Sequence, residues 1–120
     1  IFLLAPTSTP ARMERVGRLS SGFIYCMARA GVTGARSDVP DYLPPLIAQI
    51  RTHAGSTPIG IGFGVSQPEH VAAISQYADA VVVGAALVDT LHKAHASGLD
   101  KNAVLQTAGN FIASLKAATT

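Results

Sequence analysis

Three glycine-containing segments of this 120-residue chain have the residue types that suit phosphate binding: AGVTGARS at 30–37, GIGFG at 60–64 and VVVGAA at 81–86. Each follows an apolar run that predicts a buried strand and precedes a helical pattern. At such a junction, backbone N–H groups at a helix N-terminus are free to bind an anion, and glycine lets it approach closely. Three such segments in succession predict a parallel α/β barrel enzyme whose ligand carries a phosphate.

Two of these segments supply specific candidates. Gly64 ends the second segment, where its N–H could donate to a phosphate oxygen, and Gly84-Ala85 opens a helix directly from a strand. The first N–H groups of that helix need an acceptor. Glycine is also common in ordinary tight turns and at helix starts, so each motif by itself is consistent with either a phosphate site or a purely structural turn. The pair is the stronger signal because consecutive barrel strands bring their carboxyl ends side by side.

Other candidate binding residues are aromatic or lie in the 31–37 segment. Tyr25 could line a pocket for an aromatic ligand or fill the core with its hydroxyl bonded, and Phe63 has the same two interpretations. Thr33 and Arg36 could act on a substrate from a closing lid or be solvated loop residues. Arg29, at a strand end, could bind an anion or make a surface ion pair.

No catalytic acid or metal site is evident. The seven acidic residues all fall in predicted helices, caps or loops rather than at strand carboxyl ends: Glu14, Asp38, Asp41, Glu69, Asp79, Asp89 and Asp100. The four histidines fall in predicted helices: His53, His70, His92 and His95. No cysteine or carboxylate stands at a zinc-supporting spacing, so no metal is expected. The sequence therefore predicts a ligand-binding site without a catalytic acid and base.

The elements that position these residues alternate between strands and helices. Strands are predicted at 1–4, 23–28, 59–63 and 80–83, the first of them fully buried. Five helices are predicted. The first begins at Pro10 with Thr9 as its N-cap, and the second begins between Asp41 and Pro44 and ends at Gly55. The third begins at a capping box formed by Ser66 and Glu69, the fourth follows Gly84, and the fifth lies at the C-terminal end. Their expected buried faces are Met13, Val16 and Leu19; Leu46, Ile47 and Ile50; Val71, Ala72, Ile74 and Tyr77; Leu87, Val88 and Leu91; and Val104, Ala108, Phe111, Ile112 and Leu115.

This alternation predicts an α/β fold with a parallel sheet and right-handed crossovers. Two architectures fit: an open doubly wound sheet, and half of an eight-fold barrel. Residues 60–64 do not complete the G-x-G-x-x-G fingerprint of a dinucleotide fold, and the glycines lie on later turns, where barrels build phosphate sites. We therefore expect residues 1–120 to form four β/α units plus a terminal helix of one (β/α)8 barrel domain.

Composition limits the remaining functions. With 48% hydrophobic and 13% charged residues, the chain suits strands buried on both faces. The formal charge of +2 is small and the basic residues are scattered, which argues against nucleic acid. No apolar run is long enough to span a membrane. Cys26 lies in a predicted apolar strand, so we expect it to be a small buried apolar residue. A single cysteine without a disulfide partner fits a reducing compartment. Because the chain starts without methionine inside a strand, we expect it to be part of a longer protein.

In four segments the chain closely resembles the tryptophan synthase alpha chain family. Residues 1–6 resemble that family's fifth strand, and Gly22-Phe23-Ile24-Tyr25 with 31–36 resemble its sixth strand and mobile loop. Residues 62–66 with Pro68-Glu69 resemble its seventh strand and following helix, and 82–88 its eighth. The likeness covers essentially all 120 residues, in order, and the loop motif is its most specific part. It implies the C-terminal half of a (β/α)8 TIM barrel.

The resemblance also implies a function. The family splits indole-3-glycerol phosphate into indole and glyceraldehyde 3-phosphate by retro-aldol cleavage in the cytoplasm, and its partner beta subunit uses pyridoxal phosphate, so no cofactor is expected in this chain. By resemblance, the N–H groups of Gly34, Gly64, Gly84 and Ala85 hold the phosphate. Tyr25 and Phe63 contact the indole ring, while Thr33 supports a closing loop that places a catalytic aspartate.

Two departures from the family pattern change the expectation. The family usually has serine where this chain has Ala85, and one lost hydroxyl bond costs about 1 kcal/mol. The family's catalytic glutamate and aspartate lie on the second strand and the loop after it, which this sequence lacks, so the chain alone is expected to be inactive.

Two other functions stay open at this point. One is another phosphate-binding barrel, such as a ribulose-phosphate epimerase or indole-glycerol-phosphate synthase relative. The other is a non-catalytic half-barrel that binds a partner or self-associates, since bare first and fourth strands would pair with another chain.

Overall fold

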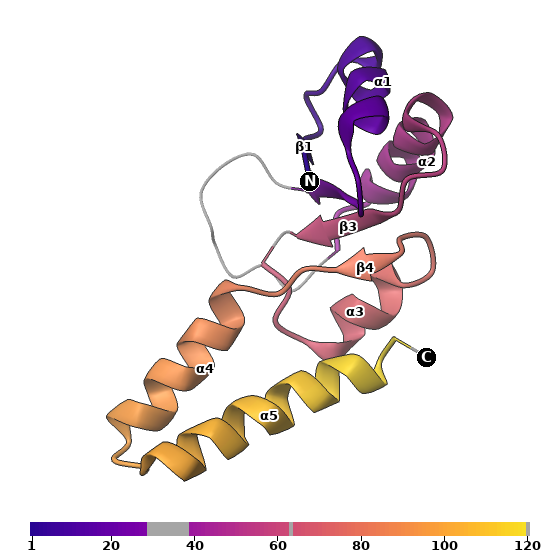
Figure 1. Cartoon of the computed structure of the whole chain (residues 1–120). Helices are drawn as coiled ribbons and strands as arrows, with labels where there is room; N and C mark the ends of the chain where they lie inside the picture. Colours follow the sequence, from indigo (N-terminus) through magenta and orange to yellow (C-terminus); the bar gives the residue numbers. More distant parts are fainter. Residues whose placement is uncertain (29–38, 63, 120) are drawn as a thin grey trace.

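The computed structural model describes residues 1–28, 39–62 and 64–119, and it has the predicted alternation of strands and helices (Figure 1). Its elements are β1 (Leu3–Leu4), α1 (Pro10–Leu19), β2 (Ile24–Met27), α2 (Leu43–Ala54), β3 (Ile59–Gly62), α3 (Pro68–Ile74), β4 (Ala80–Val81), α4 (Ala85–Ala96) and α5 (Lys101–Ala117). Each strand lies within its predicted range, and the extra terminal helix is present. The prediction of an α/β fold is confirmed.

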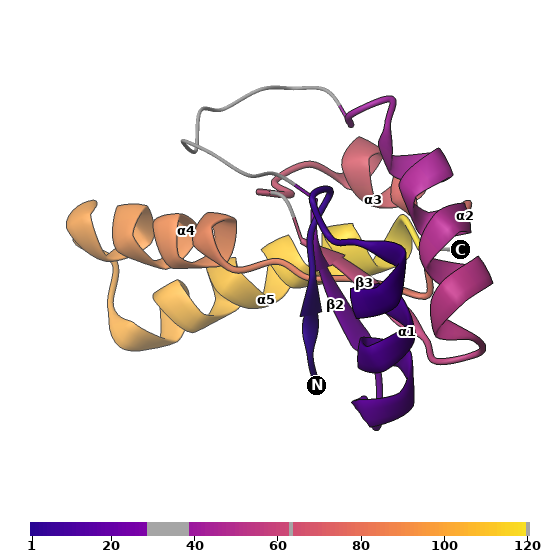
Figure 2. The ribbon, with the colours of Figure 1, turned by 90° about the horizontal axis from the view of Figure 1, so that it is seen from above.

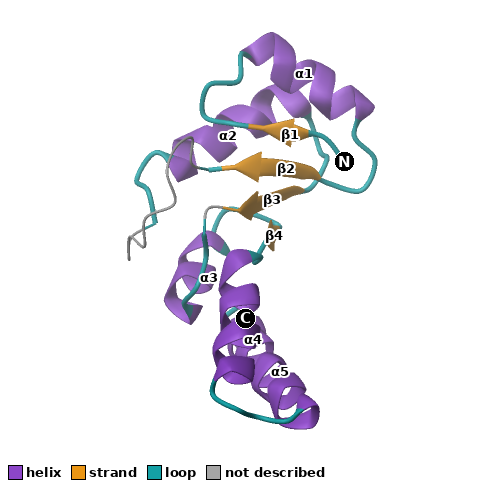
Figure 3. Cartoon of the chain, turned by 90° about the vertical axis from the view of Figure 1, so that its left-hand side faces the viewer, coloured by secondary structure: helices purple, strands orange, loops and turns teal. Residues whose placement is uncertain are grey.

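The four strands form one parallel sheet in chain order, β1-β2-β3-β4 (Figure 3). Two rows of residues run across it at neighbouring levels. One row is Leu3, Tyr25, Gly60 and Ala80, and the other is Leu4, Cys26, Ile61 and Val81. Because side chains of a strand alternate between faces, each row belongs to a different face of the sheet.

Among the described residues, the helices of the core cover one face of the sheet. The row that contains Leu4, Cys26 and Ile61 is buried in a single core with residues of α1, α2, α3 and α5. Leu3 and Met27, on the opposite face, are exposed. The expectation that the strands are buried on both faces is therefore wrong for this chain, because all the core-forming helices pack on the same side.

The prediction of a fully buried first strand is also wrong. Ile1, Phe2 and Leu3 are exposed, and within this strand only Leu4 is buried. Leu3 faces the uncovered side of the sheet, and β1 lies at the sheet edge, where it pairs with β2 alone. A continuous apolar run indicates a fully buried strand only when other elements cover both of its faces.

Helix starts follow the positions of proline. Thr9 is the N-cap of α1 and its side chain accepts a hydrogen bond from the Arg12 N–H, as predicted. Pro44 and Pro45 lie in the first turn of α2, also as predicted. The prediction of a capping box formed by Ser66 and Glu69 is wrong. Proline prefers the first helical position, so Pro68 makes Gln67 the N-cap and moves Glu69 out of the N3 position.

Most predicted helix faces are buried or half-buried, with four exceptions. The exposed residues are Leu19, Ala72, Val88 and Ile112. Leu19 ends α1, so no further turn of the helix covers it. Val88 and Ile112 belong to α4 and α5, which pack mainly on each other. Helical spacing identifies an apolar stripe correctly, but how much of it is covered depends on the neighbouring element.

Helices α4 and α5 form a hairpin that extends beyond β4, away from α1 and α2 (Figure 2). This extension makes the molecule elongated, with axes of 50 × 27 × 24 Å. Only the C-terminal part of α5 joins the main core, through Leu115. Within the described part of the chain, the hairpin thus lies past one free edge of the sheet.

Helices α1 and α2 cross in very close contact at Gly17. A Cβ atom at this glycine would lie 2.3 Å from the Ala54 carbonyl oxygen and 2.6 Å from the Ala54 Cα. Real Cβ atoms do not come so close to backbone atoms, so the absence of a side chain at Gly17 sets the distance between the two helices.

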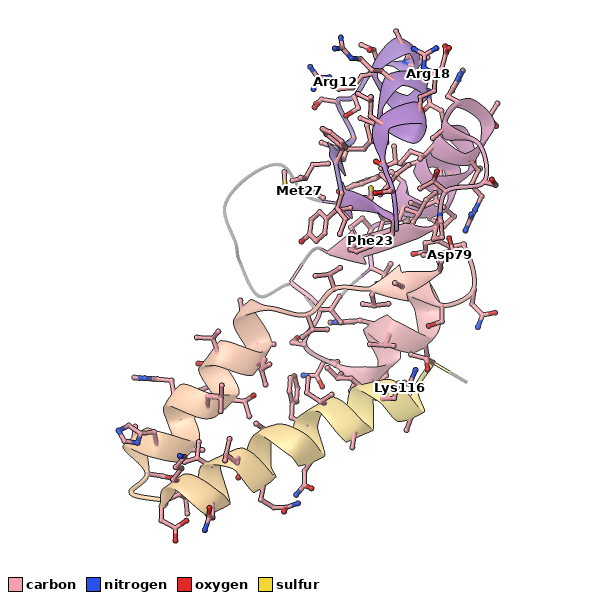
Figure 4. All side chains as sticks on the ribbon, in the orientation of Figure 1. Arg12, Arg18, Phe23, Met27, Asp79 and Lys116 are labelled. Carbon is pink, nitrogen blue, oxygen red and sulfur yellow. The ribbon has the colours of Figure 1, made fainter. Side chains whose placement is uncertain are left out.

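Asp79 joins the amino ends of β3 and β4. Its carboxylate accepts hydrogen bonds from the Ile59 N–H at 2.8 Å and from Arg51 Nη2 at 2.9 Å. The Asp79 N–H donates in turn to the Ile59 carbonyl at 3.0 Å. Figure 4 shows Asp79 at the end of the sheet away from Met27, which ends β2. This contact therefore lies at the end opposite the glycine turns.

Replacing Asp79 by asparagine is expected to remove an acid-sensitive part of the stability. Partial burial raises the pKa of Asp79, but the Ile59 hydrogen bond and the Arg51 hydrogen bond and charge outweigh it and lower the pKa below 3.8. A lowered pKa stabilises the fold above the unfolded value, and this contribution is lost as pH falls through the folded value. Because the pair is partly exposed, we expect about 1 kcal/mol at neutral pH.

Melting temperatures of the wild type and Asp79→Asn, taken from pH 7 down to pH 2, test this expectation. The difference should be largest above pH 4 and shrink towards zero in acid. A constant difference across that range would show that the charge of Asp79 contributes nothing.

Candidate functional site

The carboxyl ends of the strands form one continuous edge. Beyond the strands, the Ala28 N–H donates to the Gly62 carbonyl at 2.9 Å and the Val82 N–H donates to the Ile61 carbonyl at 2.7 Å. The register pairs Gly60 with Ala80 and Ile61 with Val81. Gly64 follows β3 by two residues and Gly84 follows β4 by three. Both candidate glycines thus come just after the carboxyl ends of neighbouring strands.

The N-terminus of α4 supplies free donors at this edge. Gly84 is its N-cap, and Ala85 is its first helical residue. The N–H groups of Leu87 and Val88 both donate to the Gly84 carbonyl. The N–H groups of Ala85 and Ala86 come too early in the helix to have an intrahelical acceptor. The first turn of α4 carries no acidic side chain that would repel an anion. These donors and the positive end of the helix dipole suit a phosphate.

Gly64 makes the neighbouring turn and leaves room for a ligand. Its φ of +88° is a conformation that L-residues rarely adopt, and an added Cβ would meet no atom within 4 Å. An added Cβ at Gly84 would likewise meet no atom within 4 Å. Against the part of the chain that the structure describes, neither glycine is needed for close packing, in contrast to Gly17. Open space above backbone donors is what an anion requires.

The structure brings Tyr25 to this site from the open face of the sheet. A Cβ at Gly62 would lie 2.3 Å from the Tyr25 hydroxyl oxygen and 2.9 Å from Cζ. Phe23 has the same relation to Gly60, with two ring atoms at 3.1 Å. The rings of Tyr25 in β2 and of Phe23 just before it thus lie over the two glycines of β3.

This pairing gives Gly60 and Gly62 a role that the sequence analysis did not assign. Both lie in β3, inside the strand predicted at 59–63. They admit the rings of Phe23 and Tyr25, whereas Gly64 has the positive φ of a turn. The two aromatics have the same spacing as the two glycines, but only the sheet register shows which residues pair.

Tyr42 is a site neighbour that the sequence prediction missed. Its hydroxyl donates a hydrogen bond to the Ala28 carbonyl, across the base of the segment that joins β2 to α2. Since the Ala28 N–H donates to Gly62, this contact links the start of α2 to the strand edge that carries the site. No sequence pattern marked this tyrosine, because its partner is a backbone carbonyl fourteen residues away.

Three predicted site residues, Thr33, Gly34 and Phe63, lie outside the described residues. Arg29, Arg36 and Asp38 lie outside them as well. Gly64, Gly84, Ala85 and Tyr25 are the predicted site residues that the structure places.

Residues with acid–base or metal chemistry stand elsewhere in the described chain. None of the described acids lies in a strand or in the three residues after one. The four histidines lie on α2, α3 and α4, and His70 is buried. Among the residues that the structure covers, no group of three His, Cys, Asp or Glu is placed to hold a metal ion. Burial raises the pKa of the Cys26 thiol to about 11, which keeps it protonated and unreactive at neutral pH.

The described helices are also too short or too polar to cross a membrane. The site so far consists of backbone donors, two open glycines and an aromatic ring. This arrangement can bind a phosphate beside an apolar group, and the residues described there include no carboxylate or histidine.

A comparison with protein families finds a match that spans nearly the whole chain. Residues 1–119 match the family model described as tryptophan synthase alpha chain. The alpha chain of Geotalea uraniireducens (strain Rf4) is 43% identical over 117 residues, which are 98% of this chain and 42% of that relative. The alpha chain of Geobacter sp. (strain M21) is 44% identical over 116 residues, covering 97% and 41% of the two chains.

Solved structures give the same likeness. A Mycobacterium tuberculosis tryptophan synthase structure superposes with a TM-score of 0.75 at 36% identity, covering 98% of this chain and 40% of the other. The tryptophan synthase alpha chain of Legionella pneumophila subsp. pneumophila gives a TM-score of 0.73 at 31% identity, covering 99% and 41%. The four parallel strands and their helices therefore match part of a larger barrel. The chain spans about two fifths of the length of these relatives.

Proposed function

The chain belongs to the tryptophan synthase alpha chain family, and on that basis we propose that it supplies the phosphate site, part of the indole pocket and the mobile loop of a barrel that cleaves indole-3-glycerol phosphate. The products of this retro-aldol reaction are indole and glyceraldehyde 3-phosphate. We place the chain as the C-terminal half of a single TIM-barrel domain, residues 1–120. The family resemblance of its four strands to the fifth through eighth supports this placement.

The observation that carries the proposal is that Gly64 and Gly84 follow the carboxyl ends of the paired strands β3 and β4, where the free N–H groups of α4 also lie. A phosphate held there receives donors from two adjacent turns, and no acidic side chain of the first helical turn competes. Gly34 would add a third donor from the loop that contains Thr33. In this chain Ala85 contributes its N–H alone, without the hydroxyl of the serine usual in the family.

The substrate's indole ring would lie on the open face of the sheet. Tyr25 is on that face, next to the same strand end. Phe63 would complete the wall. Because this face is uncovered in the isolated chain, an indole ring would be shielded from water only when further strands close the barrel.

The chemistry itself is assigned to residues outside this chain. A retro-aldol cleavage needs an acid and a base in contact with the substrate, and the described strand ends offer none. We propose that the glutamate and aspartate of an N-terminal barrel half perform the proton transfers. A beta subunit that carries pyridoxal phosphate is the proposed protein partner, in the cytoplasm, and this chain itself needs no cofactor.

Indole release from indole-3-glycerol phosphate tests this proposal. The chain alone is expected to release none. Mixed with the part of the Geotalea uraniireducens alpha chain outside the 117-residue match, which we take as its N-terminal segment, it should form an active barrel. The matched control pairs that segment with the relative's own matching 117-residue segment and tests whether the split itself is tolerated.

Two outcomes would contradict the proposal. Activity of the chain alone would place the acid and base within it and direct attention to Asp38 and Asp41. An active control pair beside an inactive mixture would show that this chain does not supply a working half.

A further inference from the structure

The hydroxyl of Tyr42 occupies a backbone acceptor beside the proposed phosphate site. We propose that Tyr42 is a positioning residue of that site: by donating to the Ala28 carbonyl, it keeps the Gly64 N–H free to bind the phosphate. This inference deepens the proposed function and rests on it for the identity of the ligand. It concerns the end of β2, the start of α2 and the turn after β3, which all belong to this chain.

The hydrogen-bond ladder between β2 and β3 keeps one offset as far as Ala28. The Ile24 N–H donates to the Pro58 carbonyl at 2.8 Å. Four residues later, the Ala28 N–H donates to the Gly62 carbonyl at 2.9 Å. In a regular parallel ladder, a residue that donates to one residue of the neighbouring strand accepts from the residue two positions further on. The next bond of a regular ladder would therefore run from the Gly64 N–H to the Ala28 carbonyl.

The structure gives this carbonyl to Tyr42 instead. The Tyr42 hydroxyl donates to the Ala28 carbonyl. Among the described residues, none accepts a hydrogen bond from the Gly64 N–H. Gly64 has a φ of +88°, which ends the extended backbone of β3. The ladder thus stops one bond early, and its next donor is left for a ligand.

The Ala28 carbonyl needs a donor because of its burial. Ala28 has no exposed surface, and a buried backbone carbonyl without a hydrogen bond destabilises the fold. If the Tyr42 hydroxyl is removed, the Gly64 N–H is the donor that the ladder pattern assigns to this carbonyl. Glycine can rotate to make that bond, because it has a wide choice of backbone conformations. An N–H group engaged in this way is lost to the phosphate.

The start of α2 fixes the backbone from which the hydroxyl reaches Ala28. Tyr42 is the N-cap of α2, and its carbonyl accepts a hydrogen bond from the Leu46 N–H at 3.0 Å. The next residue, Leu43, is fully buried. Two prolines follow it in the first turn and restrict the backbone further. The contact with Ala28 therefore comes from a firmly held residue, although the Tyr42 side chain is itself partly exposed.

Amide hydrogen exchange at Gly64 tests the first step of the proposal. It is followed by NMR in the isotope-labelled chain, with Tyr42→Phe as the variant that removes only the hydroxyl. Exchange at Gly64 is expected to be fast in the wild type and slowed at least about tenfold in Tyr42→Phe, because the N–H group then binds the Ala28 carbonyl. The Ala28 N–H, which donates to Gly62, should be protected in both proteins and shows that the sheet is intact.

Kinetics of the active barrel formed with the relative's N-terminal segment test the second step. Tyr42→Phe should raise KM for indole-3-glycerol phosphate about tenfold and leave kcat unchanged, because a phosphate contact is made equally in the ground state and the transition state. Tyr77→Phe is the matched control. The Tyr77 hydroxyl is buried, has no hydrogen-bond partner among the described residues, and lies before the amino end of β4. Its removal should change neither KM nor exchange at Gly64.

Three results would overturn the proposal. Protection of the Gly64 amide in the wild type would show that this N–H is already bonded. Equally fast exchange in Tyr42→Phe would show that the hydroxyl does not control it. A lower kcat with an unchanged KM would assign the hydroxyl to a step other than phosphate binding. Failure of the proposed function looks different: the wild-type mixture stays inactive beside an active control pair, while exchange at Gly64 still reports what Tyr42 does.

Discussion

Gly17→Ala is expected to destabilise the chain by about 1–3 kcal/mol, the usual cost of overpacking. The added Cβ would come within 2.3 Å of the Ala54 carbonyl oxygen and within 2.8 Å of the carbonyl carbon. These are backbone atoms of α2, so no side-chain rotation relieves the clash and the two helices must separate. Helix propensity alone predicts the opposite sign, since alanine favours a helix over glycine by about 1 kcal/mol.

Urea unfolding followed by circular dichroism, at one fixed protein concentration, measures this effect. Gly109→Ala is the matched control, because Gly109 is also helical and its added Cβ would meet no atom within 4 Å. It should stabilise the chain by about 0.5–1 kcal/mol. If Gly17→Ala stabilised the chain by a similar amount, the close crossing of α1 and α2 would be disproved.

Gly64→Asp should lower kcat/KM for indole-3-glycerol phosphate at least about 100-fold in the active barrel formed with the relative's N-terminal segment. A carboxylate about 4 Å from the phosphate would repel it by about 4 kcal/mol at an effective dielectric constant of 20. Aspartate tolerates a positive φ better than most residues, so the turn at φ +88° should still form.

Gly98→Asp is the control for backbone strain. Gly98 has a φ of +85° and open space around it, but it lies between α4 and α5, away from the strand ends. Both variants should lose similar stability in urea, whereas only Gly64→Asp should lose activity. Equal losses of activity in the two variants would remove Gly64 from the phosphate site.

The sequence predicted the strands and helices because apolar periodicity and proline positions report local structure directly. Thr9 and the two prolines of α2 marked helix starts that the structure confirms. The predictions that were wrong concern which apolar side chains are buried. Leu3 and Val88 have apolar neighbours at the right spacing, but burial depends on which element lies opposite, and local spacing contains no such information.

The site was predictable in part for the same reason. Gly84 and Ala85 lie where a strand passes directly into a helix, and that junction is visible in the sequence. The roles of Gly60, Gly62 and Tyr42 depend on contacts between segments far apart in the chain. Such contacts follow from sheet register, which the sequence alone did not give.

The order of the strands in the sheet has a consequence for how the chain folds. Since β1, β2, β3 and β4 are neighbours in chain order, each new strand pairs with the strand made just before it. The pairs Leu3 with Tyr25, Ile24 with Ile59 and Gly60 with Ala80 close loops of a few dozen residues. Closing loops of this length costs less entropy than pairing strands from the two ends of the chain would. During synthesis, each β/α unit can therefore dock on its predecessor as it leaves the ribosome, without waiting for the end of the chain.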